Sequence, residues 1–470
     1  MEDVRVKDIV KAAGGVLLGG DEEMEIKGFS IDSRQGGDHT LFVPIIGEKV
    51  DAHRFISGAL DINVAALTSE HDEIPEDEAG RDRAWIRVDD TVEAMQRIGT
   101  WYRERMKLPV VAVTGSVGKT TTREMIAAVL GSGLRVFQTL GNQNSQIGVP
   151  LTLSRMSKED EAAVLEIGMS ERGQIEKLTR MIRPDIAVVT VIGVSHIAQL
   201  GSQENICQEK MDIVKGLPED GLIFLNGDDP RLASYRGRLP FRVRFYGMDP
   251  SCDYRAEDIR MEGGKTRFTF LYREKDEWKR IEAVLSMMGD HNVRNALAGL
   301  GIAHEMGLNM KEAVKALACF EGQRLKVLSL PVCTVIDDTY NASPDSMKAS
   351  LKVLSDMENR PGGRKIAALA DMLELGDKER DYHYEVGRFA AGLNLDEVAV
   401  YGDLAPESLR GIKDRDQEDG ASHSPILKAF ASRGELEEYL LETAGPNDIV
   451  LLKGSNGMKL SETVRLLQDK

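Results

Sequence analysis

Short runs of apolar residues alternate with amphipathic stretches through the central part of the chain. Runs rich in Val, Ile, Leu and Ala cover residues 110–114, 162–167, 186–192 and 221–225, and stretches with helical periodicity separate them. Strands that are apolar on both faces are typical of a parallel sheet with helices on each side. The pattern therefore predicts an α/β protein built on parallel sheets.

The first hundred residues show a smaller version of this pattern. Strands are expected at 64–67 and 84–88, and a helix at 92–106. Lys107-Leu-Pro109 then marks a boundary, because proline does not continue a helix. We therefore expect a small N-terminal α/β domain over residues 1–107.

The central domain is expected over residues 108–324. Its parallel strands are followed by alternating apolar and polar residues over 241–285, with a turn at Gly263-Gly264. Such alternation predicts an antiparallel addition to the sheet. A helical stretch over 291–320 closes this domain.

After Arg324 the alternation of strands and helices begins again. It predicts a C-terminal, Rossmann-like, doubly wound domain over residues 325–470. The expected strands of this domain are 332–336, 365–370, 397–401 and 448–452. Residues 413–420 are charged and end in glycine, so we expect a loop there.

A glycine-rich turn joins the first central strand to the next helix, with the sequence Thr114-Gly-Ser-Val-Gly-Lys-Thr-Thr121. Glycines let backbone N–H groups approach a triphosphate, a lysine reaches the β- and γ-phosphates, and a hydroxyl binds Mg²⁺. The general pattern has a glycine where this chain has Val113. A structural turn is the alternative, but Gly-Lys-Thr at a strand-to-helix junction favours a nucleotide site. The expected nucleotide-binding residues are Gly115, Ser116, Val117, Gly118, Lys119, Thr120 and Thr121.

Composition restricts the partners of the chain. Its 470 residues carry a formal net charge of −17, with 42% hydrophobic and 29% charged residues, as in an ordinary globular protein. This charge argues against nucleic acid as a partner, and it means that a phosphate site needs local cations or a metal. No apolar run is long enough to span a membrane and no signal peptide is recognisable, so we expect a cytoplasmic protein. The four cysteines have no metal-binding spacing and are expected to be buried, inert thiols.

Polar residues that follow the other apolar strands are candidates for chemistry. Glu166 ends one strand, His196 follows the next, and Lys210 lies on the helix after it. Because the carboxyl ends of parallel strands share one edge, Glu166 and His196 are expected beside the phosphate loop. Taken singly, each has a plainer interpretation: a paired or capping carboxylate, a satisfied histidine and a solvated lysine.

A further candidate segment, Asp337-Asp-Thr-Tyr-Asn-Ala-Ser-Pro344, directly follows the first expected strand of the C-terminal domain. Its acids, aromatic ring and amide could bind a ribose, a base edge or a metal. Taken alone, an Asx turn that caps the next helix is the simpler interpretation.

Together these segments resemble the Mur ligases, the ATP-dependent amide-forming enzymes of peptidoglycan precursor synthesis, and most closely the MurF type. The resemblance covers nearly the whole chain. Besides the phosphate loop and the segments above, it rests on Phe29-Ser-Ile-Asp-Ser-Arg34, Leu41-Phe-Val-Pro-Ile-Ile-Gly47, Gly141-Asn-Gln-Asn144, Ile147-Gly-Val-Pro150, Glu166-Ile-Gly-Met169, Gly289-Asp-His-Asn292, Asn295-Ala-Leu297, Asp371-Met-Leu-Glu-Leu-Gly376 and Lys453-Gly-Ser455.

This resemblance implies a reaction that joins a carboxylate to an amine through an acyl phosphate. It assigns Thr120 and Glu166 to one Mg²⁺, and His196 and Lys210 to a second. An ammonium group cannot ligate Mg²⁺, so the resemblance also implies a carbamate on Lys210. A carbamate needs a neutral amine, and burial and nearby cations must therefore lower the pKa of this lysine.

The resemblance implies binding residues in every domain. Lys119 and Arg324 would stabilise the phosphoryl group during transfer. The adenosine would be held by Asn292, Asn295, Asp338, Tyr340 and Asn341. The UDP-sugar peptide would contact Ser33, Arg34, Phe42, Asn142, Asn144, Ser145, Lys453 and Ser455. The ATP site would then span two domains, and the C-terminal domain must close to complete it.

The implied enzyme adds D-alanyl-D-alanine to UDP-N-acetylmuramoyl-tripeptide, releases ADP and phosphate, and acts as a monomer. Folylpolyglutamate synthases begin closer to the phosphate loop, and diaminopimelate-adding relatives carry an Asp-Asn-Pro-Arg stretch that this chain lacks. A catalytically inactive regulator would be expected to have lost some of the phosphate-loop and metal residues, which are all kept. Another Mur-type ligase with a different amine is the remaining alternative.

Some positions depart from the family pattern. The usual Asn-Asn-Glu is Asn144-Ser-Gln146, the usual Asp-Gly-His is Asp51-Ala-His53, and Asn456 stands where an arginine is usual. Gln323 is inserted before Arg324. These changes fall on residues expected near the substrates rather than on the nucleotide and metal residues.

Overall fold

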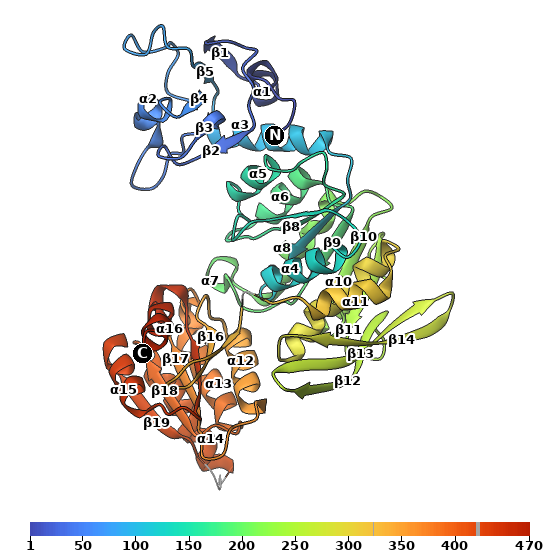
Figure 1. Ribbon diagram of the computed structural model, residues 1–470, viewed down its shortest axis with the longest axis vertical. Helices are drawn as coiled ribbons and strands as arrows, with labels where there is room; N and C mark the ends of the chain where they lie inside the picture. The colour runs from blue at the N-terminus through green and yellow to red at the C-terminus, as the bar shows by residue number, and fades with distance from the viewer. Residues whose placement is uncertain (323, 420–423) are drawn as a thin grey trace.

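The computed structural model describes residues 1–322, 324–419 and 424–470. Within this part of the chain the strands form three sheets, which belong to an N-terminal, a central and a C-terminal domain (Figure 1). Most neighbouring strands are parallel, and helices pack on the sheets. The predicted three-domain α/β class is therefore confirmed.

The N-terminal sheet has the strand order β1-β5-β4-β3-β2, in which only β1 runs antiparallel to its neighbour. Its strands are β1 Val16–Gly19, β2 Gly28–Ser30, β3 Gly37–Phe42, β4 Asn63–Thr68 and β5 Ala84–Arg87. The helices of this region are α1 Val6–Ala13, α2 Ile56–Ala59 and α3 Thr91–Arg105, with the 3₁₀ helix η1 Ala52–Phe55. Asp90 caps the N-terminus of α3, and its carboxylate accepts a hydrogen bond from the N–H of Glu93.

The central sheet has the strand order β14-β13-β12-β11-β10-β9-β6-β8-β7. Its strands are β6 Val110–Thr114, β7 Val136–Gln138, β8 Ala162–Glu166, β9 Ile186–Val189, β10 Leu222–Asn226, β11 Arg242–Gly247, β12 Tyr254–Glu262, β13 Lys265–Glu274 and β14 Glu277–Leu285. The helices are α4 Lys119–Leu130, α5 Gly148–Leu153, α6 Gln174–Ile182, α7 Ile197–Leu200, α8 Gln203–Met211, α9 Pro230–Ala233, α10 Asp290–Glu305 and α11 Met310–Ala318, with the 3₁₀ helix η2 Asp212–Gly216. Strands β6, β8 and β9 are buried along their whole length, as their apolar sequences require.

The C-terminal sheet has the strand order β15-β16-β20-β17-β18-β19, in which β15 runs antiparallel to β16 and the other neighbouring strands are parallel. Its strands are β15 Lys326–Ser329, β16 Thr334–Asp338, β17 Lys365–Ala370, β18 Glu397–Tyr401, β19 Ile426–Phe430 and β20 Ile449–Lys453. The helices are α12 Pro344–Asp356, α13 Glu379–Ala391, α14 Ala405–Asp419, α15 Arg433–Thr443 and α16 Leu460–Gln468, with the 3₁₀ helices η3 Gly376–Lys378 and η4 Asn456–Met458.

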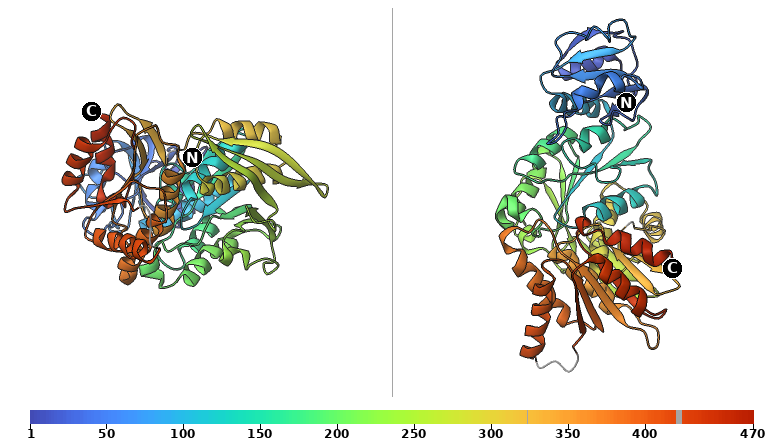
Figure 2. Two further views of the ribbon diagram at one scale, coloured as in Figure 1. Left: turned by 90° about the horizontal axis from the view of Figure 1, so that it is seen from below. Right: turned by 90° about the vertical axis from the view of Figure 1, so that its left-hand side faces the viewer.

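The three domains follow one another along the long axis of the molecule, and the views in Figures 1 and 2 agree on this order. The N-terminal domain contacts the central domain through helix α3. There the Tyr102 hydroxyl donates to the Met156 carbonyl at 2.9 Å, and the buried Arg103 guanidinium donates to the Ile182 carbonyl at 2.8 Å. The C-terminal domain lies at the other end of the central domain, on the side of α7.

Several details differ from the expectations drawn from the sequence. Strand β11 lies in the segment predicted as antiparallel, yet it pairs parallel with both neighbours. In this segment the antiparallel pairs are β12 with β13 and β13 with β14. Residues 413–419 belong to helix α14 rather than to a loop, since a highly charged helix gives little apolar periodicity, and Gly420 lies outside the described residues. The antiparallel strand β15 precedes the strand that we expected to be first in the C-terminal domain.

The expectation of four buried thiols was wrong for one cysteine. Cys207, Cys252 and Cys333 are buried, whereas Cys319 is exposed at the end of α11. Spacing alone does not reveal exposure, because a residue that follows a helix can face either way. In the part of the chain that the structure describes, no helix is both long and apolar enough to cross a membrane.

Candidate functional site

The phosphate loop connects β6 to α4 and depends on two glycines. Gly115 has φ +151°, and a Cβ atom there would lie 1.8 Å from the Thr190 hydroxyl. Gly118 has φ +86° and directly precedes α4, so that the first N–H groups of this helix face the loop. A side chain at either position would therefore deform the surface that is shaped for phosphate.

Two lysines converge on one carbonyl of this loop. Lys119 and Lys210 each donate from Nζ to the Gly115 carbonyl oxygen, at 2.9 Å. Lys210 is only 1% exposed, and burial, followed by the charge of Lys119, lowers its pKa well below the ordinary value. Burial also lowers the pKa of Lys119. Two amines this close favour an anion at the loop, although the protein as a whole is acidic.

Glu166 ends β8 beneath the start of α4 and is 2% exposed. Its carboxylate accepts hydrogen bonds from the Thr120 hydroxyl at 2.9 Å and from Asn144 Nδ2 at 2.7 Å. The Arg123 guanidinium lies 3.7 Å from the same carboxylate. The structure thus brings Thr120, Glu166 and Asn144 together, and it supplies a buried cation that compensates the charge of Glu166.

His196 precedes α7 with φ +65°, a left-handed conformation that is uncommon for a residue with a side chain. Burial lowers the pKa of His196 to about 4, and the charges of Lys210 and Lys119 act in the same direction. The imidazole is therefore neutral near pH 7 and has a lone pair available for a metal ion. Its closeness to both lysines agrees with the expected position beside the phosphate loop.

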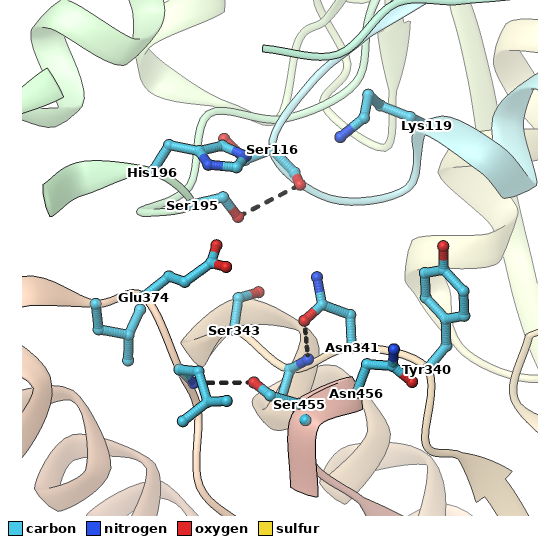
Figure 3. Close-up of a pocket in the computed structure, with 14 residues that line it drawn as sticks. Ser116, Lys119, Ser195, His196, Tyr340, Asn341, Ser343, Glu374, Ser455 and Asn456 are labelled. Atoms are coloured by element: carbon cyan, nitrogen blue, oxygen red, sulfur yellow. Dashed lines mark hydrogen bonds between the residues drawn. The ribbon is translucent and has the colours of Figure 1, made fainter. Parts of the chain in front are cut away.

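A cavity of about 310 Å³ lies between the phosphate loop and the C-terminal domain (Figure 3). Central-domain residues form one face and loops of the C-terminal domain form the other. The lining residues are Ser116, Lys119, Ser195, His196, Tyr340, Asn341, Ala342, Ser343, Leu373, Glu374, Leu375, Ser455, Asn456 and Gly457. Tyr340, Asn341 and Ser455 were predicted from the sequence, whereas Ser195 and Glu374 were not.

Arg324 and Tyr340 contact each other beside this cavity. The guanidinium carbon of Arg324 lies 3.3 Å from the centre of the Tyr340 ring, a cation–π geometry. Tyr340 is 47% exposed, so one face of its ring is open to solvent or ligand. The segment 337–344 also caps α12, since Ser343, the residue before Pro344, forms a capping box with Ser346 in the first turn of the helix. The capping and binding interpretations of this segment are therefore compatible.

The two predicted adenosine asparagines lie buried on α10. Asn295 accepts a hydrogen bond from the Thr122 hydroxyl at 3.0 Å, which ties α10 to α4. Asn292 donates to the Met288 carbonyl at 2.8 Å. A Cβ on Gly118 would lie 3.1 Å from Asn295 Oδ1, so this amide lies directly behind the phosphate loop.

Lys453 was predicted to contact substrate, but the structure contradicts a direct contact. Lys453 is 1% exposed and donates to Asp338 Oδ2 at 2.5 Å and to the Asn341 carbonyl at 3.0 Å. Asp338 also accepts from the Ser350 hydroxyl at 2.6 Å. Lys453 thus lies beneath the Asp338–Asn341 segment and holds it in place. Ser455, two residues later, does line the cavity.

Phe42 is a second correction. It was predicted to contact the uridine diphosphate, yet it is fully buried in β3 and packs in the core with Ile56 and Trp85. Ser33 and Arg34 lie in the loop after β2, where Arg34 Nε donates to Asp32 at 2.9 Å. Arg34 is well exposed and available to a ligand. These two residues lie in the domain at the far end of the molecule from the cavity (Figure 1).

The remaining predicted substrate residues follow β7. Asn142 and Ser145 are exposed, and the Ser145 hydroxyl accepts a hydrogen bond from the Gly148 N–H at 3.2 Å. Asn144, between them, is the residue that bonds Glu166. Gln323, the insertion before Arg324, lies outside the described residues.

Arg123 is a residue that the sequence analysis missed. It is 3% exposed, donates to Glu124 Oε1 at 2.8 Å and to the Gly141 carbonyl at 3.1 Å, and lies beside Glu166. It therefore joins α4 to the loop that carries Asn144. The spacing contained this signal, because Arg123 lies three residues after Thr120, on the same face of a helix whose first turn is expected to bind phosphate.

Asp51, His53 and Glu70 place three potential ligand atoms within 4.8 Å of one another in the N-terminal domain. Yet His53 Nε2 accepts the N–H of Ser69 at 3.1 Å, and its Nδ1 lies 2.7 Å from Asp51. Both ring nitrogens are therefore engaged, and the cluster acts as a support for the loop that begins at Asp51.

Comparison with known proteins places this arrangement in a family. The family model of the Mur ligase middle domain matches residues 113–303, and that of the Mur ligase, glutamate ligase domain matches residues 323–456. The UDP-N-acetylmuramoyl-tripeptide–D-alanyl-D-alanine ligase of Bacillus subtilis (strain 168) is 37% identical over 466 residues, which cover 98% of this chain and 97% of that protein.

Solved structures give the same result. MurF from Acinetobacter baumannii (crystal structure I) has a TM-score of 0.88 with 28% identity, over 99% of both chains. MurF ligase from Thermotoga maritima, in complex with ADP, has a TM-score of 0.80 with 27% identity, over 94% of this chain and 97% of that one. Because these similarities extend over nearly the whole sequence and all three domains, the chain belongs to the Mur ligase family, within its MurF group.

Proposed function

We propose that this protein is an ATP-dependent ligase that joins D-alanyl-D-alanine to UDP-N-acetylmuramoyl-tripeptide, the substrates named for its Bacillus subtilis relative. The γ-phosphoryl group of ATP passes to the terminal carboxylate of the tripeptide, which gives an acyl phosphate and ADP. The dipeptide amine then attacks the acyl carbon. The C–N bond forms as the bond to phosphate breaks, and phosphate and a proton are released.

The observation that carries this proposal is the convergence of Lys119, Lys210 and His196 at the phosphate loop, next to a cavity that the C-terminal domain closes. Transfer of a phosphoryl group to a carboxylate brings two anions together. Lys119 and the fixed N–H groups of the loop are placed to stabilise the charge that develops in such a transfer, while the neutral His196 and Lys210 are placed to hold a metal ion there. Glu166 and Thr120 lie at the same loop and offer the oxygen ligands that Mg²⁺ prefers.

The side chains suit two metal ions and a modified lysine. Thr120 and Glu166 would hold one Mg²⁺, while the neutral His196 and a carbamate on Lys210 would hold the second. The lowered pKa of Lys210 supplies the neutral amine that a carbamate requires. When bound, the metal ions neutralise the γ-phosphate and the substrate carboxylate.

The function is tested with purified protein, UDP-N-acetylmuramoyl-tripeptide, ATP and a set of amines that includes D-alanyl-D-alanine, L-lysine and diaminopimelate. We expect phosphate release and a pentapeptide mass only with the dipeptide. Turnover with another amine and none with D-alanyl-D-alanine would reject the proposed substrate and favour another Mur-type activity.

The carbamate is tested with Lys210→Ala. We expect kcat to fall by a factor of about 100 or more, and short carboxylates such as acetate to restore part of it. Because the substitution removes a desolvated amine, the thermal midpoint should stay unchanged or rise. Lys215→Ala, one turn later and paired with Glu176 at the surface, is the matched control and should keep full activity. Full activity of Lys210→Ala would reject the modification.

We also infer domain limits of 1–107, 108–324 and 325–470, on the grounds that each sheet lies inside one of these ranges. Limited proteolysis near residues 107 and 324 would test them. The monomeric state and the cytoplasmic location stay predictions, and light scattering of the purified protein tests the first.

A further inference from the structure

Glu374 stands out among the residues that line the cavity. Among the described lining residues it is the one carboxylate, and it comes from the C-terminal face. Figure 3 shows its carboxylate pointing across the cavity toward Ser195 and His196. Lys119 lies on the opposite face, so the two faces of the cavity carry charges of opposite sign.

The backbone of Glu374 is held in an uncommon conformation. Its φ is +65°, in the left-handed region that favours glycine. The two residues before it are fixed by hydrogen bonds: the Met372 N–H donates to His383 Nε2 and the Leu373 N–H donates to the Ser455 hydroxyl, both at 2.9 Å. A strained residue persists where its surroundings fix it, and such residues gather at binding sites.

The same segment contacts the central domain. A Cβ on Gly376 would lie 3.0 Å from the Cβ of Ala198, which shows that the end of the Glu374 segment packs against α7. Helix α7 begins directly after His196. The position of Glu374 relative to the phosphate loop is therefore set by this contact between domains, and it is reached when the C-terminal domain lies against α7.

We propose that Glu374 binds the positively charged amino group of the incoming peptide on the C-terminal face of the cavity. This inference rests on the proposed function, since it concerns the second substrate of that reaction. A peptide α-amino group is largely protonated at neutral pH and offers three N–H donors, for which a carboxylate is the natural acceptor. Lys119 is placed to attract the anionic substrates and Glu374 the cationic one, whose ammonium group gives up one proton to water before its lone pair attacks the acyl carbon.

The test compares Glu374→Gln with Asp377→Asn. Both remove one carboxylate and keep the side-chain shape, and Asp377 is exposed three residues later, outside the cavity lining. For Glu374→Gln we expect kcat/KM for D-alanyl-D-alanine to fall about 10- to 100-fold, with KM for ATP and for the UDP-tripeptide within twofold of the wild type. Asp377→Asn should match the wild type. Binding of ADP by each variant shows that the fold is kept.

Two results would overturn the inference. One is a Glu374→Gln enzyme with unchanged kinetics toward the amine. The other is an increased Mg²⁺ requirement or KM for ATP at unchanged amine kinetics, which would make Glu374 a metal or nucleotide ligand. The wild-type enzyme is measured first: if it used a different amine, the proposed function would fail, yet the same comparison with that amine would still test Glu374.

Discussion

The two faces of the cavity are built in different ways. Behind the central-domain face, Glu166 and Lys210 are 2% and 1% exposed and lie at the end of a strand or on a packed helix. On the C-terminal face, Tyr340 and Leu373 are 47% and 44% exposed and belong to segments that follow strands. One face holds buried charges in fixed positions, while the other presents accessible side chains.

This difference has a physical reason. Phosphoryl transfer needs charges that are already oriented and shielded from water, because electrostatic interactions are strongest there. Binding and release of a substrate need surface that becomes accessible when domains move apart. The protein therefore assembles the charges of the reaction within one domain and receives the contacts that complete the site from another.

The largest effect on stability is expected where one partner of a buried ion pair is removed. Arg123→Ala removes the cation that lies between Glu124 and Glu166, both of which are buried. An uncompensated buried charge typically costs about 3–5 kcal/mol, so we expect the free energy of unfolding of the central domain to fall by that amount. Denaturant unfolding measures it.

Arg135→Ala is the matched control on the surface of the same domain. Arg135 pairs with Glu159, and both side chains are more than half exposed, so this variant should lose less than about 1 kcal/mol. Equal losses for the two variants would mean that burial does not distinguish the two ion pairs. Arg123→Lys should fall between the two, because it keeps the charge but cannot make three separate contacts.

The sequence predicted the central-domain face better than the C-terminal one. A carboxylate at the end of an apolar run, such as Glu166 after 162–165, cannot be buried without a partner, and the parallel topology places it beside Thr120. The position of Glu166 therefore follows from the local sequence and from one rule of topology. The glycines of the phosphate loop can likewise be recognised from the local sequence.

The remaining residues depend on packing that periodicity does not encode. Phe42 and Lys453 both end strands in recognised motifs, yet each turns into the protein rather than toward a ligand. Glu374 belongs to a motif that the sequence analysis recognised, but no role was predicted for this residue. The orientation of Glu374 depends on the contact of Gly376 with α7, which the sequence pattern does not reveal. Arg123 was missed because an arginine on an amphipathic helix is usually solvated.

A second, smaller effect is expected from pH, at a histidine of α10 that lies near charged groups of both the central and the C-terminal domain. Burial lowers the pKa of His291 to about 4. The charged groups around it are Asp338, Arg294, Lys453 and Asp290. The unfolded chain, with a histidine pKa near 6.5, binds this proton more readily, so stability rises with pH between about 4 and 6.5 and the contribution is complete above that window. When the pH falls from 7.5 to 5, the contribution of His291 to the free energy of unfolding therefore decreases by about 2 kcal/mol.

His291→Gln should remove this part of the pH dependence. Denaturant unfolding at pH 7.5 and pH 5 then shows a difference about 2 kcal/mol smaller than that of the wild type. His39→Gln, on an exposed residue of the N-terminal domain, should leave the wild-type difference in place. A His291→Gln variant with an undiminished pH dependence would show that other groups account for the acid sensitivity of this interface.

The smallest effect is expected on the accessible face. Tyr340→Ala removes the ring that lies 3.3 Å from the Arg324 guanidinium, a contact worth about 1 kcal/mol at an exposed site, so KM for ATP should rise about 3- to 10-fold. Tyr340→Phe keeps the ring and should stay within twofold. Because the side chain is half exposed, neither variant should change the free energy of unfolding by more than about 0.5 kcal/mol. If Tyr340→Ala instead unfolded the C-terminal domain, Tyr340 would act through packing. If Tyr340→Phe raised KM for ATP as much as Tyr340→Ala does, Tyr340 would act through its phenol hydroxyl. In either case the contrast between a buried, fixed face and an accessible one would fail at this residue.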